Sequence, residues 1–599
     1  MGNLQAFRNL RQNLFIVHEY KSRSTHYGQI MKNHTIFTGL IFSFLLSVTL
    51  LANAGDTPPQ AAIATAHPLA TQVGQEILNS GGNAFDAAVA VTAALGVVEP
   101  YGSGLGGGGF WLLHRNADNF QVMVDGREKA PMAAHRDMYL DDKGEVIPGA
   151  SIDGPLAAGI PGVPAAMVHI AKKYGRLSLA KNLAPAIRLA RDGFKVDKQY
   201  RRYAEMRLKT LQRFPETAKL FLHDNTVPPL GYRLKQEDLA NTLESIAQHG
   251  ESDFYRGALA KRLVDAVKKA GGIWSLDDLK NYRIVEREPV RTEYRGMKLI
   301  SAALPSSGGI TLASMLQMLQ QYDLHKMSDT DRAHLIIEIM RRAYRDRAEY
   351  LGDSDFVDVP VARLTSTAYA KELVKGIQMD DAMPSAELRP VGKPGGAGSD
   401  TTHFSILDKE GNRVAATLSV NYLFGSCFVV PGTGFLLNDE MDDFSAKPGV
   451  ANAYGLIGAE ANAIEPGKRP LSSMSPTFLE DKRGIAIIGT PGGSRIISMV
   501  LLAALQYAEG ADASSIVQFP RFHHQYMPDI VMFEDDAFSG KTEQELALRG
   551  HMLKKQMSPY GGGFGHYGNM QGIVWDKHKN KVTAASDARG IGAAVVFKQ

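Results

Sequence analysis

One stretch of the 599-residue chain restricts the fold more than any other, because residues 401–421 have the pattern of a strand, a turn and a second strand. The Gly411-Asn412 pair supplies turn chemistry, and β-branched and alternating residues flank it. If the turn is centred on Glu410, Thr401 faces Ser419 across the hairpin, and Asn421 follows on the same face. A slip by one residue would undo this arrangement. Taken alone, a pair of threonines at the start of a strand reflects ordinary β-propensity.

The composition is that of a globular protein, with 44% hydrophobic and 22% charged residues. The length predicts several domains or one very large one. The formal charge is +3, but residues 1–54 hold five of the basic residues and one of the acidic ones. Residues 55–599 therefore carry 61 basic and 62 acidic residues, which leaves them near neutral. This balance gives no electrostatic case for a nucleic-acid partner.

The first 54 residues have the pattern of a targeting segment. Lys32 gives a short positive start, an apolar run extends from Ile36 to Leu51, and Ala52-Asn53-Ala54 has the small-x-small pattern of a signal-peptidase site. We expect a signal peptide at residues 31–54, an N-terminal extension of uncertain role at residues 1–30, and an exported mature protein in the periplasm. The alternative is an uncleaved signal segment that anchors the protein in the membrane, facing outward.

Several patterns that would indicate a cofactor are incomplete. The single cysteine, Cys427, excludes an internal disulfide and a cysteine metal cluster. Gly540-Lys541-Thr542 resembles the end of a phosphate-binding loop, but Asp535 stands where that loop needs glycine. The adjacent His523 and His524 point to different faces, and the acidic run 439–443 lacks the spacing of a calcium loop. We expect no cofactor and no metal.

Helix and strand patterns alternate along the rest of the chain. Leu69 to Leu78 predicts a short helix, and Asn83 caps a helix of small residues that ends near Val98 and should be buried on nearly all sides. Helical periodicity dominates residues 161–280, whose charged faces should meet water. The other expected elements are a hairpin at 110–114 and 121–124, a strand at 294–301, a helix after the turn at 304–310, a charged helix at 332–350, a strand at 485–488 and a helix at 496–508.

Two glycine-rich segments allow more than one interpretation. Gly102–Phe110 could cradle a phosphate, but close backbone packing or a substrate-facing loop is favoured because no strand precedes it and no helix follows. Gly492-Gly493 lies between a strand and a helix, where backbone N–H groups could point at an anion or simply form a tight turn.

Arg127 and the linker before Thr401 also leave alternatives. The Arg127 guanidinium, at a strand end, could be solvated or could bind a carboxylate. Residues 385–400 are rich in glycine and proline, which predicts a mobile linker leading directly into Thr401.

Taken together, eight segments resemble the γ-glutamyltranspeptidase (glutathione hydrolase) family of N-terminal-nucleophile hydrolases. They follow the family's order over nearly the whole mature chain. They are Asn83–Ala90, Gly102–Phe110, Arg127-Glu128 with Ala130-Pro131, Pro305–Gly309, Thr401-Thr402-His403, residues 436–445, Pro470–Pro476 and Pro491–Arg495.

The resemblance implies an α/β fold, the four-layer αββα sandwich of N-terminal-nucleophile hydrolases, built from two chains cut from one precursor. The cut would fall between Asp400 and Thr401, leaving a large subunit of residues 55–400 and a small catalytic subunit of residues 401–599. A threonine hydroxyl is a weak nucleophile, and the α-amino group freed by the cut, with a pKa of about 8, can serve as its base. Asp400 leaves the rate of this cleavage open.

The same resemblance implies roles for individual residues. Thr401 would attack the γ-glutamyl carbonyl, and Ser419, where the family often has threonine, could orient it. The other implied roles are oxyanion binding by Gly492 and Gly493, α-carboxylate binding by Arg127, Ser472 and Ser473, α-ammonium binding by Asn421, Glu440 and Asp443, and a lid loop at residues 448–455 that includes Tyr454.

The implied function is that of a γ-glutamyltransferase and glutathione hydrolase. It would pass the glutamyl group of glutathione and related compounds to water, an amino acid or a dipeptide. Because buried carboxylates need a cationic partner, Glu440 and Asp443 argue against acylases whose substrates lack an α-amino group. Two alternatives stay open: a related amidase, such as a cephalosporin-type acylase or a poly-γ-glutamate-cutting enzyme, and an unprocessed protein that only binds.

Overall fold

The computed structural model describes residues 56–388, 401–555 and 568–599, which lie in one compact unit. The expected signal peptide, Asp400 and residues 389–400 of the expected linker lie outside the described residues. In the described part of the chain, no helix is both long enough and apolar enough to cross a membrane.

The hairpin expected at residues 401–421 forms in the predicted register. Strand β9 (Thr402–Leu407) pairs antiparallel with β10 (Arg413–Ser419), and Leu418 lies opposite Thr402. The next position in this register sets Ser419 opposite Thr401, which confirms the sequence prediction. In the turn, one Asp408 carboxylate oxygen accepts hydrogen bonds from the backbone N–H groups of Glu410 and Asn412, each at 2.9 Å. Gly411 has a φ of +85°, which glycine adopts without strain.

This hairpin occupies the middle of a seven-stranded antiparallel sheet with the order β18-β1-β9-β10-β2-β3-β6. A second antiparallel sheet of six strands has the order β17-β16-β12-β11-β8-β7. The remaining bounds in the first sheet are β1 (Ala61–Thr65), β2 (Gly108–Arg115), β3 (Phe120–Asp125), β6 (Val285–Arg287) and β18 (Ala593–Phe597). Those in the second are β7 (Val290–Tyr294), β8 (Met297–Ser301), β11 (Thr477–Asp481), β12 (Gly484–Gly489), β16 (Gln571–Asp576) and β17 (Lys581–Ser586).

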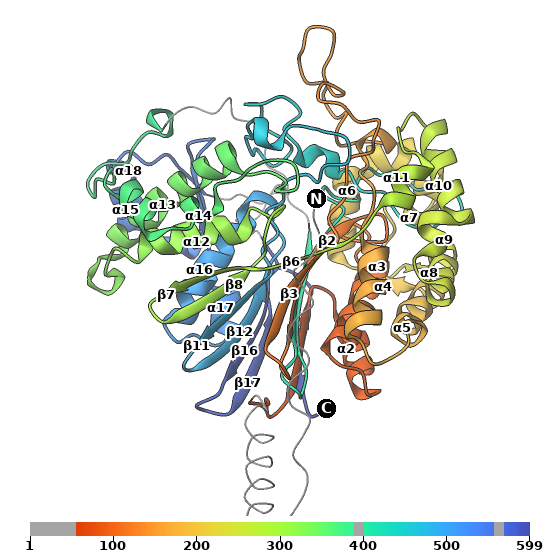
Figure 1. Ribbon diagram of the computed structural model, residues 1–599, viewed down its shortest axis with the longest axis horizontal. Helices are drawn as coiled ribbons and strands as arrows, with labels where there is room; N and C mark the ends of the chain where they lie inside the picture. Colours follow the sequence, from red (N-terminus) through yellow and green to blue (C-terminus); the bar gives the residue numbers. More distant parts are fainter. Residues whose placement is uncertain (1–55, 389–400, 556–567) are drawn as a thin grey trace, which may run out of the picture. The chain divides into compact units, whose positions relative to one another are not determined.

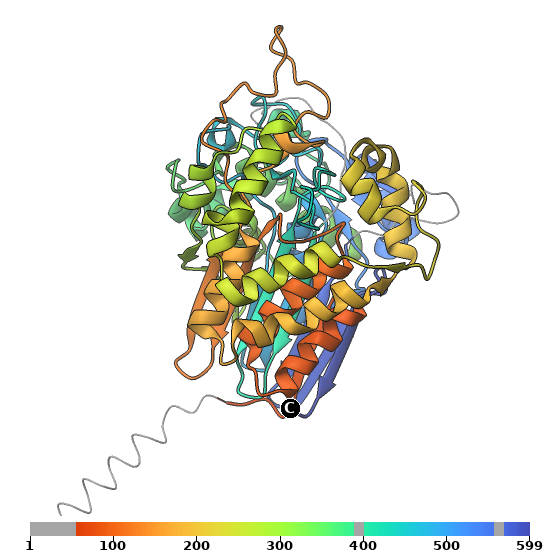
Figure 2. The same ribbon diagram turned by 90° about the vertical axis from the view of Figure 1, so that its right-hand side faces the viewer.

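Alternation along the strands divides the interior into two main cores. Trp111 and Leu113 of β2 pack in the core that includes helix α3, whereas Phe110 and Leu112 pack in the core shared with the second sheet. One group of helices covers the outer face of the first sheet and another covers the outer face of the second (Figure 1, Figure 2). The result is the expected four-layer αββα sandwich.

The helices on the first sheet are α2 (Pro68–Asn79), α3 (Ala84–Val98), α4 (Val163–Tyr174), α5 (Leu179–Asp192), α6 (Lys198–Arg213), α7 (Pro215–Phe221), α8 (Glu237–His249), α9 (Ser252–Arg256), α10 (Ala258–Lys269) and α11 (Leu276–Asn281). The later helices are α12 (Gly308–Leu319), α13 (Asp329–Tyr350), α14 (Val361–Leu364), α15 (Thr367–Val374), α16 (Ile496–Ala508), α17 (Ala513–Gln518) and α18 (Gly540–Leu548). The short strands β4 (Phe194–Lys195), β5 (Arg233–Leu234), β13 (Phe522–His523), β14 (Val531–Phe533) and β15 (Leu553–Lys555) form two small sheets.

Helix α3 confirms the prediction of a buried helix of small residues. A capping box at Asn83 and Asp86 begins it, and its residues are buried on nearly all sides. The helix packs against β9 and β10, so it supports the hairpin from behind.

The charged helix α13 is more buried than its composition suggests. Glu338, Arg341 and Arg342 are all buried. Glu338 accepts hydrogen bonds from Arg341 at 3.0 Å and from Arg342 at 2.6 Å. Pairing of this kind is what allows charged side chains into a protein interior.

Candidate active site

A narrow pocket lies at the end of the β9–β10 hairpin, where Thr401 and Ser419 meet. Its cavity volume is about 20 Å³, roughly the space of one water molecule. Nine of the residues predicted from the sequence line it: Thr401, Ser419, Asn421, Glu440, Asp443, Tyr454, Ser472, Ser473 and Gly493. The fold therefore brings together side chains that are up to 92 positions apart in the sequence.

The segment that follows Thr401 is fixed by buried side chains. Thr402 donates a hydrogen bond to the carboxylate of Glu99 at 2.7 Å, and Tyr101 donates to the same group at 3.1 Å. Burial raises the pKa of Glu99, although these hydrogen bonds oppose the shift. Sequence reasoning missed Glu99, whose only signal is an acidic residue at the end of an apolar helix.

Ser419 and Asn421 form one side of the pocket through the backbone. The Ser419 hydroxyl accepts a hydrogen bond from the Asn421 N–H at 2.8 Å, and Asn421 has a φ of +75°. The Asn421 side chain donates to the Asp439 carbonyl at 3.0 Å. Tyr454 of the expected lid loop donates its hydroxyl to the Asn421 carbonyl at 2.6 Å. The lid residue is thus held directly against the end of the hairpin.

The glycine run 102–110 serves close backbone packing, as favoured from the sequence. A Cβ atom at Gly107 would lie 2.1 Å from the Ser419 carbonyl oxygen, and one at Gly106 would lie 2.0 Å from that of Leu436. Only glycine permits these approaches. The run therefore joins the hairpin end to the acidic segment 436–445.

The Gly492-Gly493 pair connects β12 to α16 in a backbone conformation that favours glycine, with φ values of +146° and +56°. Gly493 lines the pocket and packs against Tyr454, whose ring would be 2.3 Å from a Cβ atom at this position. Gly492 precedes it and is not among the described lining residues. Among the described backbone hydrogen bonds, neither glycine donates its N–H.

Arg127 is wholly buried and stands at the centre of the charged part of the site. Its guanidinium donates to Glu440, to Asp443 at 2.5 Å and to the Pro470 carbonyl at 3.1 Å. Glu128 lies 3.6 Å from the same guanidinium. Of the two sequence interpretations, the solvated one is wrong, because the guanidinium is buried and pairs with the protein's own carboxylates.

Burial dominates the electrostatics of these acidic groups. It raises the pKa values of Glu128, Glu440 and Asp443, and the neighbouring Arg127 opposes the shift in each of them. The residues predicted to bind opposite ends of a glutamyl group are therefore in direct contact with each other. A zwitterionic ligand would replace these internal contacts with contacts of its own.

The two serines predicted to bind a carboxylate are supported by segment 305–309. Ser307 donates its hydroxyl to the Ser472 carbonyl at 2.6 Å, and Ser306 donates to the Met474 carbonyl at 2.6 Å. Arg347 of α13 donates to the hydroxyls of Ser307, at 2.9 Å, and Ser473, at 3.1 Å. Sequence reasoning missed Arg347, because nothing distinguishes it from the other arginines of its helix.

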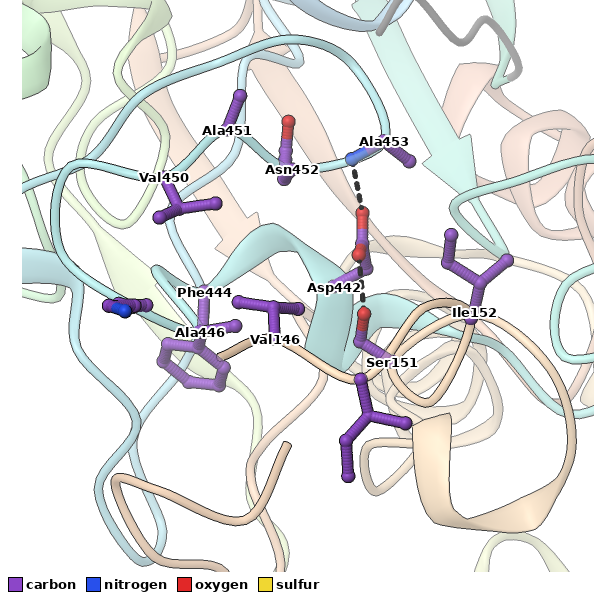
Figure 3. Close-up of a pocket in the computed structure, with 13 residues that line it drawn as sticks. Val146, Ser151, Ile152, Asp442, Phe444, Ala446, Val450, Ala451, Asn452 and Ala453 are labelled. Atoms are coloured by element: carbon purple, nitrogen blue, oxygen red, sulfur yellow. Dashed lines mark hydrogen bonds between the residues drawn. The ribbon is translucent and has the colours of Figure 1, made fainter. Parts of the chain in front are cut away.

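The lid loop is tied to the carboxylates beside the pocket. Asp442 accepts hydrogen bonds from the Ser151 hydroxyl at 2.7 Å and from the Ala453 N–H at 2.9 Å (Figure 3). Asn452 donates to Asp443 at 3.3 Å. A second cavity, of about 220 Å³, lies between this loop and residues 146–152. The loop 448–455 and the segment 146–152 therefore meet at Asp442.

Comparison with known proteins gives a consistent result. The family model for gamma-glutamyltranspeptidase matches residues 70–597. The glutathione hydrolase proenzyme of Pseudomonas sp. (strain A14) is 42% identical over 528 residues, which cover 86% of this chain and 91% of that protein.

Two solved structures show the same fold. Cephalosporin acylase from Bacillus halodurans matches with a TM-score of 0.78 and 28% identity, covering 90% of this chain and 96% of that one. Gamma-glutamyltranspeptidase from Helicobacter pylori matches with a TM-score of 0.53 and 41% identity, covering 54% of this chain and 94% of that one. On the evidence of a family match that extends over both sheets and the pocket, the chain belongs to the γ-glutamyltranspeptidase family.

Proposed function

We propose that the chain is the precursor of a γ-glutamyltransferase and glutathione hydrolase that becomes active by cutting itself between Asp400 and Thr401. The observation that carries the proposal is the shared pocket of Thr401 with Ser419, Asn421, Glu440, Asp443, Ser472 and Ser473. A nucleophile and binding groups for both charges of an amino acid lie within one small space. The naming of its relatives as glutathione hydrolase proenzymes supports glutathione and similar γ-glutamyl compounds as substrates.

Cleavage would produce the catalyst. It leaves the large subunit 55–400 and the small subunit 401–599, whose first residue is Thr401 with a free α-amino group. This amine takes the proton of the Thr401 hydroxyl as the oxygen adds to the γ-glutamyl carbonyl. Ser419, opposite Thr401 in the hairpin register, orients the hydroxyl.

The remaining steps follow from the charge that develops. The N–H groups of Gly492 and Gly493 stabilise the oxyanion. When the intermediate collapses, the protonated α-amino group of Thr401 gives its proton to the leaving amine, and the amine product departs. A γ-glutamyl ester of Thr401 remains. Water then releases glutamate, or the amine of an amino acid or dipeptide accepts the glutamyl group.

Recognition of the glutamyl end uses the groups that now contact each other. The α-ammonium is bound by Asn421, Glu440 and Asp443, and the α-carboxylate by Arg127, Ser472 and Ser473. Tyr454 covers the bound group. Residues 31–54 direct export, with the periplasm as the compartment; an uncleaved signal that anchors the enzyme facing outward is the alternative.

A related acylase is the second candidate, since the acylase structure shares the fold. Buried Glu440 and mostly buried Asp443 favour the first candidate, because the two carboxylates match an α-ammonium that a glutaryl group lacks. The test compares the release of chromophore from a γ-glutamyl anilide and a glutaryl anilide by purified, processed protein. Sequencing of the smaller polypeptide should begin at Thr401. A fully processed sample that cleaves only the glutaryl substrate, or neither, overturns the proposal.

A further inference from the structure

Arg347 is a buried cation that the mechanism above does not use. Its side chain comes from α13 and is only 5% exposed. All its hydrogen bonds among the described residues go to serine hydroxyls, Ser307 and Ser473. Arg341 and Arg342 on the same helix instead pair with Glu338. Arg347 forms no ion pair with any carboxylate of the described residues.

A buried guanidinium in this situation is costly, because its lost hydration is not offset by an anion. Burial accordingly lowers the pKa of Arg347, and the nearby charge of Asp443 only partly opposes this. Asp443 itself is hydrogen-bonded to Arg127. Arg347 also lines a small cavity together with Asp443, Asn452 and Leu471, directly behind the serines. Arg347 is therefore a buried cation that has no carboxylate partner of its own among the described residues, although Asp443 lies near it.

The two neighbouring serines have hydroxyl protons to donate. Ser473 accepts a hydrogen bond from Arg347, and Ser472 accepts one from the Met474 N–H at 3.1 Å. Neither hydroxyl donates to any group of the described residues. A serine hydroxyl can donate one hydrogen bond in addition to those it accepts. Each of these two hydroxyls already accepts one, so its proton remains free to donate to a ligand. Both residues line the pocket that contains Thr401.

Arg127 differs from Arg347 in this respect. Two carboxylates, Glu440 and Asp443, already neutralise it. In the described structure Arg347, unlike Arg127, contacts the serine side of the pocket without a paired carboxylate.

We propose that Arg347 is a positioning residue for recognition of the donor's α-carboxylate: it orients Ser473, fixes segment 305–309 through Ser307, and supplies positive potential to the anion that the two serine hydroxyls bind. The inference rests on the proposed function and deepens it. It adds Arg347 to the proposed carboxylate-binding group of Arg127, Ser472 and Ser473, and it makes Arg347 a determinant of specificity for substrates that carry an α-carboxylate.

The experiment compares inhibitors with and without the α-carboxylate, so that its contribution to binding is measured separately. Processed wild-type enzyme and the variants Arg347→Gln and Arg347→Lys are assayed with a γ-glutamyl anilide, and two competitive inhibitors are titrated. L-Glutamate carries the α-ammonium, the α-carboxylate and the γ-carboxylate, whereas 4-aminobutyrate keeps the ammonium and the carboxylate that matches the γ-carboxylate and lacks only the α-carboxylate. For Arg347→Gln, KM and the inhibition constant of glutamate should rise about 10- to 100-fold, as expected for loss of a charge-assisted interaction. The inhibition constant of 4-aminobutyrate should change by less than about twofold, and Arg347→Lys should recover part of the loss because it keeps the charge.

A matched control lies on the same helix. Arg345 pairs with Glu349 at 3.5 Å and is not among the residues that line the pocket, so Arg345→Gln should leave both inhibition constants unchanged. A purely structural role for Arg347 would weaken binding of both inhibitors equally and lower kcat with them, and that result overturns the proposal. An unchanged glutamate constant overturns it as well.

A second variant keeps the test decisive if Arg347→Gln accumulates as uncut precursor. Ser307→Ala removes the Nε partner of Arg347 and leaves its charge. It should raise the inhibition constant of glutamate about 3- to 10-fold with no change for 4-aminobutyrate. Equal effects on the two inhibitors count against the proposal here too. Failure of the proposed function is a different outcome, because processed wild-type enzyme would then release no chromophore from the γ-glutamyl anilide.

Discussion

Leu418 lies opposite Thr402 in the β9–β10 ladder, and this pairing sets Ser419 across from Thr401. On the side of β10 away from β9, Gly107 packs so closely on the Ser419 carbonyl oxygen that a Cβ atom there would lie 2.1 Å from it. A shift of one residue would move every side chain of both strands to the other face and remove Thr401 from the pocket. The position of the proposed nucleophile is thus a property of the central sheet.

Replacement of Thr401 by alanine should yield a single uncut chain. In the proposed function the Thr401 hydroxyl carries out the self-cleavage, and without cleavage no terminal amine forms. A denaturing gel of the purified variant should show one band near 65.1 kDa, less any signal peptide removed. Thr401→Ser should still be cut, and Thr417→Ser in the neighbouring strand serves as a control that is processed normally. Two bands from Thr401→Ala would show that the cut does not depend on this residue.

Replacement of Asp443 by asparagine should remove recognition of the α-ammonium. It also takes one carboxylate from buried Arg127, and breaking a buried pair is costly by about 3–5 kcal/mol. We expect kcat/KM for a γ-glutamyl anilide to fall at least about 100-fold, since 1.4 kcal/mol corresponds to tenfold. The ratio of γ-glutamyl to glutaryl turnover should fall with it. Retention of that ratio would show that Asp443 does not bind the ammonium.

The two subunits should remain together after cleavage. Strands from residues 55–400 and 401–599 are neighbours at β18–β1, β1–β9, β10–β2 and β8–β11. These ladders do not include the bond that is cut, so their hydrogen bonds and the shared cores survive it. Gel filtration should give one species that contains both polypeptides, which separate only in denaturant. Elution of the small subunit alone under native conditions would contradict this.

Acid should destabilise the fold through buried histidines. Burial lowers the pKa of His551 to about 2, and nearby His334, Arg341 and His524 add to the shift while Asp529 opposes it. Between this value and about 6.5, the unfolded chain binds a proton that the folded chain does not, so stability is full above about pH 7 and falls as the pH decreases. At pH 5 this one group accounts for about 2 kcal/mol, from 1.36 kcal/mol per pKa unit.

The measurement is urea unfolding at several pH values between 5 and 7.5. His551→Gln should flatten the dependence by about one proton, and replacement of the exposed His578 by glutamine should leave it as in the wild type. Equal slopes for wild type and His551→Gln would exclude His551 as a source of the acid sensitivity.

Local signals predicted the elements around the site. The Gly-Asn turn and its flanking alternation defined the hairpin and its register, and Asn83 marked the start of α3. These features depend on neighbours in the sequence, which a single sequence displays. The roles proposed for Arg127 and the serines came from the resemblance to a family, since Arg127 reaches Pro470 and Leu471, next to the serines, only through the tertiary fold.

Other features could not be predicted for the same physical reason. Glu99 and Arg347 acquire their importance from partners at 402 and 473, and no spacing rule links such positions. The direct contact of Arg127 with Glu440 and Asp443 was also unexpected, because charge counting alone assigns them to opposite ends of a ligand. Burial explains this contact, because opposite charges inside a protein pair with each other when no ligand lies between them.

At Asp442, a loop of the proposed large subunit meets a loop of the proposed small subunit, because this side chain accepts hydrogen bonds from Ser151 and Ala453. Ser151 precedes the cut and Ala453 follows it, and both lie on loops rather than on the sheets. Loops tolerate changes in length and sequence that a sheet register does not. Changes in either of these loops can therefore alter the surroundings of the pocket from either polypeptide, while the hairpin that carries Thr401 stays as it is.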